Sequence, residues 1–205
     1  RKTEELGVIN INYLQADILD LEMLDKQFDI IESAGVLHHM ADPIAGWRVL
    51  TNCLKPGGLM KIGLYSEIAR QHIVRARDMI TKNKITSVKK DMPAFRQKVI
   101  TLNDPELNLL KKSNGFYSTS ELRDLLFHVQ EHRFTIPQII KIIDELGLVF
   151  MGFEFADMKK KLKEFKEIYP TSASKYELDK WHDYEMLNPR LFSDMYQFWC
   201  QKLSL

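Results

Sequence analysis

Five short stretches of the chain are rich in apolar, β-branched and aromatic residues, and turn signals bound them. Runs of this length and composition are typical of strands, and those bounded by Gly, Pro, Asn or Asp are the clearest. The polar opening RKTEEL, closed by Gly7, instead predicts the last turn of a helix. The expected strands lie at residues 8–14, 28–35, 59–65, 148–155 and 195–203.

A helical pattern separates the second and third expected strands. Apolar residues at positions 44, 47, 50 and 54 fall on one face of a helix. Asp42 can cap the start of this helix, and Pro43 suits its first position. Strand, helix and strand joined by short turns indicate parallel α/β construction.

The pattern divides the rest of the chain into a long helical part and a final part. Residues 66–145 read as helical, with breaks near 91–93, 103–105 and 113–115, where Pro, Asn, Asp and Gly gather. We therefore expect three segments: a partial core, an all-helical insertion that could cover it, and a final segment of strands and a helix that completes the core. Their ranges are 1–65, 66–147 and 148–205.

Composition narrows the function classes. Lys and Arg total 29 against 28 Asp and Glu, so no net field attracts a nucleic acid or an anionic membrane, and neither partner is expected. The two cysteines, Cys53 and Cys200, lie in apolar surroundings without a CxxC spacing, which favours buried thiols in a reducing, cytoplasmic compartment. No apolar run approaches the length of a membrane span.

Several motifs resemble one family. The segments QADILDL, FDIIESAGVLHHMADP and LKPGGLMKIGLY follow one another in the order and spacing seen in the second half of the class I S-adenosylmethionine-dependent methyltransferases, especially those that act on small molecules. The resemblance covers residues 1–65 closely and the last two expected strands more loosely. It implies an α/β fold with a mostly parallel, Rossmann-like sheet that carries the helical insertion.

The resemblance also implies a cofactor, S-adenosylmethionine, and residues that contact it. Asp17 would contact the adenine amino group and Ile18 would pack on the adenine ring. The segment after the second expected strand would lie along the cofactor, with the small residues admitting it close to the backbone. Asp17 also has a simpler interpretation, as the cap of an Asx-type turn. The cofactor-side residues of that segment are Ser33, Ala34, Gly35 and His38.

One expected part of the family pattern is missing. A first strand, a GxGxG loop and a second strand ending in an acidic residue normally hold the methionine and ribose, and none occurs here. We therefore expect this chain alone to bind the cofactor weakly and to be inactive. Without those strands, either residues 8–14 move over to pair with residues 28–35, or residues 28–35 form an open edge. Because an open edge is a template for another chain, we predict self-association by edge pairing or by exchange of the amino-terminal segment.

Histidines are the candidate catalytic residues. His38 and His39 follow the strand end where the methyl group would lie, so either could act as a general base or orient a nucleophile. In the alternative interpretation His38 caps local backbone and His39 faces solvent. His128, in the helical insertion, is a third candidate for the substrate pocket.

A second motif, HVQEH, gives a different hypothesis. His128, Glu131 and His132 follow the HxxEH order of inverted zinc proteases, and helical spacing would place Asp124 on the same face. Because no third ligand stands out, we expect no metal and read the segment as part of a lid helix that begins near Ser118.

The leading prediction is transfer of a methyl group from S-adenosylmethionine to a small molecule or a peptide side chain. Two alternatives remain at this point. One is a non-catalytic Rossmann-like module that binds a partner chain, and the other is a metal-dependent hydrolase that uses HxxEH.

Overall fold

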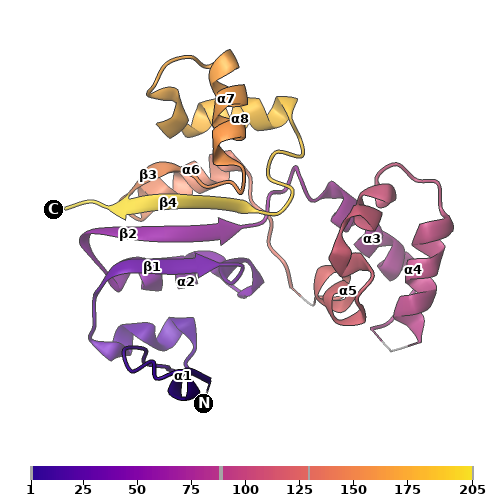
Figure 1. The fold of residues 1–205 in the computed structure, drawn as a ribbon, viewed down its shortest axis with the longest axis horizontal. Helices are drawn as coiled ribbons and strands as arrows, with labels where there is room; N and C mark the ends of the chain where they lie inside the picture. The colour runs from indigo at the N-terminus through magenta and orange to yellow at the C-terminus, as the bar shows by residue number, and fades with distance from the viewer. Residues whose placement is uncertain (1, 88–89, 129, 205) are drawn as a thin grey trace.

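A four-stranded sheet forms the centre of the protein, in a computed structural model that describes residues 2–87, 90–128 and 130–204 (Figure 1). Its strands are β1 (Phe28–Ala34), β2 (Leu54–Leu64), β3 (Leu148–Phe153) and β4 (Tyr196–Lys202), in the order β1-β2-β4-β3. β1 runs parallel to β2, whereas β4 runs antiparallel to both of its neighbours. β1, β2 and β3 therefore share one direction, which confirms the expected mostly parallel α/β sheet.

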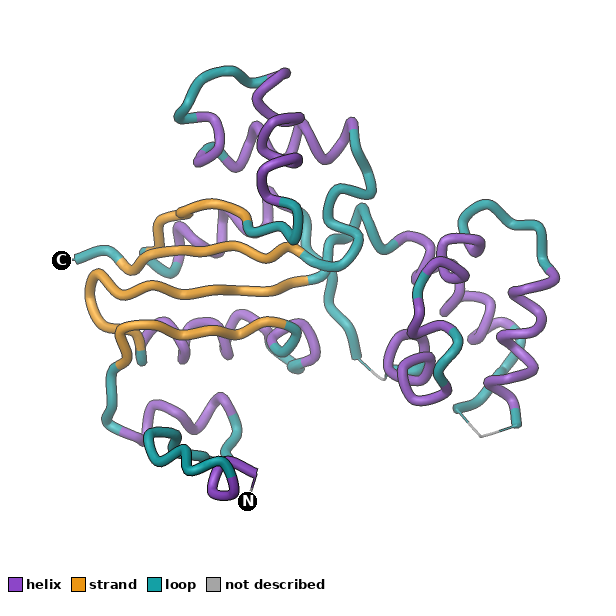
Figure 2. Tube along the Cα trace, in the orientation of Figure 1, coloured by secondary structure: helices purple, strands orange, loops and turns teal. Residues whose placement is uncertain are grey.

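Helices cover the sheet and extend beyond it (Figures 1 and 2). The α-helices are α1 (Lys2–Glu5), α2 (Pro43–Asn52), α3 (Gln71–Lys82), α4 (Asp91–Thr101), α5 (Thr119–Leu126), α6 (Ile136–Glu145), α7 (Met158–Ile168) and α8 (Leu178–Leu187). Short 3-10 helices are η1 (Ile18–Leu24), η2 (Leu37–His39), η3 (Leu107–Lys112), η4 (Asn114–Phe116) and η5 (Ser174–Tyr176).

Local sequence explains where α2 begins. The Asp42 side chain accepts hydrogen bonds from the backbone amides of Ile44 and Ala45, both at 3.0 Å, and Pro43 occupies the first turn as predicted. The apolar stripe then buries Trp47 and Leu50 in the sheet core, together with side chains of β2. This packing fixes the segment between β1 and β2 against the sheet.

The helical insertion has a core of its own. Side chains from α3, α4, η3, η4 and α5 form a second buried cluster, which lies beyond the end of β2 (Figure 1). This cluster runs from Ile73 to Leu126, whereas α6 packs its isoleucines into the sheet core. The last helix of the expected 66–147 insertion is thus part of the core layer.

The amino-terminal segment differs from the expectation. Gly7 adopts φ 67° and ends α1, as predicted. Residues 8–14 form no strand, however, and Ile9 is 95% exposed, so that prediction was wrong. A β-rich sequence needs a neighbouring strand to satisfy its backbone, and none of the described residues pairs with this segment. β1 is consequently an edge strand.

No helix in the described part of the chain is both long and apolar enough to cross a membrane.

Candidate functional site

The carboxyl ends of β1 and β2 are shaped by glycines. Gly63 of β2 pairs with Ala34, and a Cβ at Gly63 would lie 2.8 Å from the Ala34 Cα. Gly35 then turns the chain away from the sheet with φ 78°, a conformation that glycine adopts without strain. The chain passes directly into η2, which carries the two adjacent histidines.

Aromatic rings from three segments stack next to this turn. The His38 ring lies 3.9 Å from the Tyr65 ring and 4.3 Å from the His39 ring, measured between centroids. His39 in turn stacks on His128, with centroids 4.0 Å apart and planes 16° from parallel. At the other end, the Arg70 guanidinium lies 3.6 Å from the Tyr65 ring centre. The structure therefore brings His38, His39 and His128 together, although they are far apart in the sequence.

The three histidines differ in their surroundings. His38 is fully buried, and neither of its ring nitrogens has a hydrogen-bond partner in the described structure. Burial, followed by repulsion from His39 and Arg70, lowers the pKa of His38 to about 3, while the nearby Gly63 backbone opposes this shift. His38 is thus a neutral ring inside the stack at physiological pH.

A cavity of about 480 Å³ opens beside the stack. Gly35, His39 and Tyr65 line it from the sheet side, whereas His128 lines it from the insertion. Two carboxylates, Glu121 and Asp124, also face it, and the remaining lining residues are Ser113, Gly115 and Leu125. The cavity therefore offers imidazole and carboxylate groups that can orient an acceptor or take up a proton. His38 lies behind this wall and is not part of the lining.

A buried ion network ties the insertion to the core. The side chain of Glu131 is 1% exposed and accepts two hydrogen bonds from Arg70, at 2.9 and 3.2 Å. Arg77 and Arg133 approach the same carboxylate to 3.6 and 3.9 Å. Sequence reasoning missed this network, because it had assigned Glu131 only to the HxxEH motif.

Backbone bonds fix the returning chain over η2. The His132 amide donates to the His38 carbonyl at 2.8 Å, and His39 Nδ1 lies 3.1 Å from the Gln130 carbonyl. The Phe134 amide donates to the Tyr65 carbonyl at 2.9 Å. Together these bonds hold the end of the insertion against the carboxyl ends of β1 and β2.

The helical spacing expected for HxxEH was wrong. α5 ends at Leu126, so Asp124, His128 and His132 do not share a helix face. Glu131 is held by arginines and cannot activate water there. Within residues 2–87, 90–128 and 130–204, no three His, Cys, Asp or Glu side chains form a group that could hold a metal ion. The hydrolase alternative required a shared helix face for Asp124, His128 and His132, and the structure does not provide one.

The expected cofactor residues take several positions. Asp17 caps η1 by accepting from the Leu19 amide at 2.9 Å, which is the Asx-type role. Ile18 packs partly buried against the sheet core. Ser33 is buried and its hydroxyl has no partner among the described residues, whereas Ala34 is exposed at the strand end. Their contacts with a cofactor stay a prediction.

A buried carboxylate supports the base of the insertion. Ser66 donates to Glu185 at 2.6 Å, and the Tyr196 hydroxyl donates to both oxygens of Glu185 at 2.8 and 2.7 Å. Burial raises the pKa of Glu185, partly opposed by these hydrogen bonds. Sequence reasoning missed Ser66 and Glu185, because the pairing joins positions far apart in the chain. Tyr65 was also missed, although an aromatic residue that ends a predicted strand was an available signal.

Known proteins share a sequence profile and a fold with this chain. The profile of a family described as "Methyltransferase domain" matches residues 1–62. PKMT2 from Rickettsia typhi superposes on the whole chain with a TM-score of 0.71 at 13% identity, and its complex with AdoHcy does so with 0.67 at 14%. Residues 1–62 thus match a methyltransferase domain and the whole chain shares the fold of PKMT2, which supports the expected resemblance to the class I S-adenosylmethionine-dependent methyltransferases.

The relatives are longer than this chain. An uncharacterized protein of Synechococcus sp., syc1184_c, is 27% identical over 191 residues, which are 88% of this chain and 46% of that protein. The chain likewise covers 41% of each PKMT2 structure. It therefore spans less than half the length of the relatives that it matches.

Proposed function

We propose that this chain supplies the adenine-side and acceptor-side residues of an S-adenosylmethionine-dependent methyltransferase that acts on a small molecule or a peptide side chain. One observation carries the proposal: a polar cavity lies at the carboxyl ends of two parallel strands, beneath a helical insertion, in a chain with this fold. Open parallel sheets bind their ligands at that end.

Features of the strand end support a cofactor at this place. The left-handed turn at Gly35 leaves the backbone without a side chain, and the buried Ser33 hydroxyl has no hydrogen-bond partner among the described residues. When bound, S-adenosylmethionine would supply an electrophilic methyl group. Ser33, Ala34 and Gly35 would lie along it, with Asp17 and Ile18 at its adenine end.

The acceptor side depends on the stacked histidines. His39 and His128 line the cavity, so we assign them to orienting the acceptor or removing its proton. His38 is assigned a supporting position behind them, because its buried ring does not face the cavity. Since displacement at a methyl group depends mainly on alignment, the insertion residues that line the cavity would contribute to the rate enhancement by positioning the acceptor.

A cytoplasmic location is part of the proposal. Cys53 and Cys200 are both free thiols and both buried, which suits a reducing compartment.

The test separates cofactor binding from turnover in the protein that carries this chain. Asp17→Ala should weaken S-adenosylmethionine binding in calorimetry, whereas His39→Ala and His128→Ala should lower methyl incorporation more than cofactor affinity. Asp17→Asn is the matched control, because it keeps a capping oxygen for η1 and removes only the charge. Equal losses of cofactor affinity in all of these variants would contradict the assignment.

A partner-binding module remains a second candidate, and one observation favours it. The edge strand β1 exposes Phe28 by 41% and Ile30 by 57%, and residues 8–14 are also exposed. Such an edge can pair with another chain. This candidate predicts a stable complex without transfer of labelled methyl groups to any component of a cell extract, whereas the methyltransferase predicts a labelled product.

A further inference from the structure

Three cavities follow one another between the sheet and the insertion. The cavity beside the histidines shares Tyr65, Ser113 and Leu125 with a second cavity of about 460 Å³, here called the middle chamber. The middle chamber shares Ala69, His72, Leu109 and Arg190 with a third cavity of about 810 Å³, the outer chamber. Each has the size of a small-molecule site, and the first cavity and the middle chamber adjoin at Tyr65, Ser113 and Leu125.

The middle chamber has a distinct charge. Its described lining includes the cations Arg70, Lys112 and Arg190 and a single acid, Asp194. Arg70 is neutralised by Glu131, whereas no ion pair or hydrogen bond involves the Lys112 ammonium or the Arg190 guanidinium within the described structure. Two exposed cations against one acid leave an excess positive charge in this chamber.

In their described linings, the chambers on either side lack this excess. Glu121 and Asp124 line the first cavity without a lysine or arginine among its described lining residues, and in the outer chamber Glu67 is paired with Arg133 at 2.9 Å, which leaves two glutamates against two cations. Those outer residues are Glu67, Glu106, Glu164, Lys161 and Arg190. An anionic group is therefore favoured in the middle chamber over either neighbour.

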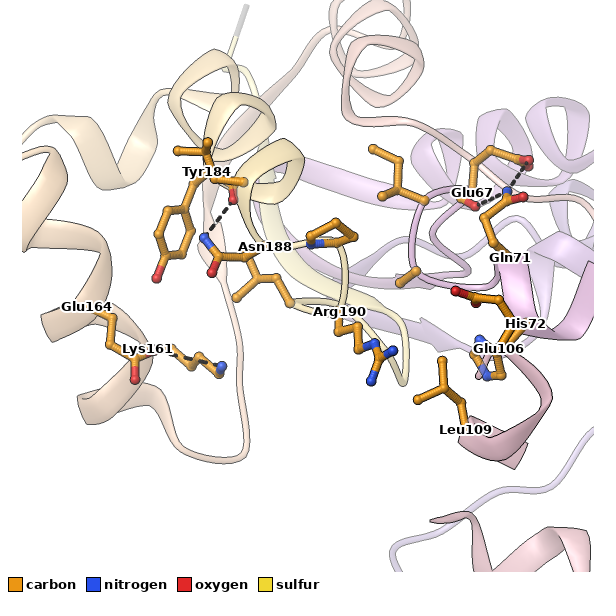
Figure 3. A pocket seen from close by; sticks show the side chains of 15 residues that line it. Glu67, Gln71, His72, Glu106, Leu109, Lys161, Glu164, Tyr184, Asn188 and Arg190 are labelled. Carbon is orange, nitrogen blue, oxygen red and sulfur yellow. Dashed lines mark hydrogen bonds and ion pairs between the residues drawn. The ribbon is translucent and has the colours of Figure 1, made fainter. Parts of the chain in front are cut away.

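Arg190 is placed to receive such a group. Figure 3 shows its side chain extending from the loop after α8 into the space that faces Leu109 of the insertion. His72 lies on the same wall, and burial lowers its pKa, with Arg70 adding to the effect. The neutral imidazole of His72 therefore adds no further charge to the chamber. The guanidinium of Arg190 can bind a carboxylate through two parallel hydrogen bonds.

We propose that the middle chamber is a carboxylate subsite, and that the methyl acceptor carries a carboxylate which Arg190 and Lys112 bind while its reacting group lies in the first cavity, beside the stacked rings of His39 and His128. This inference rests on the proposed function, because it takes the first cavity as the site of transfer. A single negative charge fits better than a phosphate dianion, since Asp194 and the acids of both neighbouring chambers repel added charge. The carboxylate can belong to a free acid or to a glutamate within a peptide.

Binding of defined probes tests the subsite without any methyl transfer. The α-methylamide of N-acetylglutamate, which keeps only its side-chain carboxylate, and a short blocked peptide with one central glutamate represent the two sources, and their glutamine analogues are the neutral partners. Calorimetry on the protein that carries this chain should show a preference for glutamate over glutamine of about tenfold or more in at least one pair. The pair that shows the preference identifies the source.

Variants test whether the preference for glutamate over glutamine arises from the middle chamber. Arg190→Gln and Lys112→Gln should each reduce the preference for glutamate, and Asp194→Asn should increase it. Arg48→Gln is the matched control, because Arg48 is an exposed arginine of α2 outside the three cavities and its loss should change nothing. Equal affinity for glutamate and glutamine probes, absence of binding by all four, or a preference unchanged in Arg190→Gln would overturn the inference. A preserved preference without methyl transfer would instead count against the proposed function alone.

Discussion

His38 makes the stability of the protein depend on pH in a direction that the structure fixes. The ring is fully buried with no hydrogen-bond partner in the described part of the chain, and its pKa falls from 6.5 to about 3 on folding. The unfolded chain therefore binds a proton that the folded chain excludes between these two values. Stability from His38 is fully present above the unfolded pKa and is lost as pH falls toward the folded pKa.

The size of the effect follows from the same two values. Each pH unit below the unfolded pKa costs about 1.4 kcal/mol while the folded ring stays neutral. Between about pH 8 and about pH 5, His38 alone should remove about 2 kcal/mol from the free energy of unfolding. Other titrating groups contribute as well, so the useful quantity is the difference between wild type and a variant that lacks this imidazole.

Urea unfolding at the two pH values measures that difference. His38→Phe keeps a ring against Tyr65 and cannot be protonated, so its loss of stability on acidification should be about 2 kcal/mol smaller than that of wild type. His38→Gln is the matched control: it packs differently and has a different absolute stability, yet should show the same reduced pH dependence. Parallel losses in wild type and both variants would refute the conclusion that the folded protein excludes a proton from His38.

Three further predictions concern the insertion and the sheet edge. Glu131→Gln leaves Arg70 buried without its counter-ion and should cost about 3–5 kcal/mol in urea unfolding, with faster hydrogen exchange in α3 and α5. The control, Glu145→Gln at an exposed ion pair, should cost at most about 0.5 kcal/mol. Similar costs in both variants would contradict the stabilising role of the Arg70–Glu131 pair. The folded protein raises the pKa of Glu185, so the contribution of this carboxyl group to stability declines as pH rises above its ordinary pKa. Glu185→Gln should remove that decline from the free energy of unfolding between about pH 5 and about pH 8. An unchanged dependence of the free energy of unfolding on pH would contradict the raised pKa. Wild type should self-associate in light scattering through the β1 edge, and Ile30→Lys should shift it toward monomer; wild type that is already monomeric at high concentration would disprove this.

The elements that the sequence predicts well depend on local signals. The Asp42 cap, the Pro43 start and the apolar stripe together specify α2 wherever the helix packs. The Ser118 cap similarly predicts the start of α5. Residues 8–14 carry an equally good strand signal, yet a strand also needs a partner, and composition does not supply one.

From the sequence, the site could be predicted only where its residues lie close together in the chain. The approach of His39 to the carboxyl end of β1 is local, so the motif that contains it sufficed. Its stacking on His128, and the ion pairs of Glu131 with Arg70, join segments separated by a whole folded insertion. No spacing rule contains that information. HxxEH misled for the same reason, because the helix expected to carry it ends first.

The position of β4 has a consequence for biosynthesis. Residues 196–202 are made after β1, β2 and β3, yet they form the only strand that joins β2 to β3 among the described residues. A chain emerging from the ribosome therefore carries β1 and β2 as one unit, and α6 with β3 as another that has no strand to pair with. The two halves of the sheet can unite only when the final strand slides between them. A chain that stops before β4 should therefore leave two exposed sheet edges.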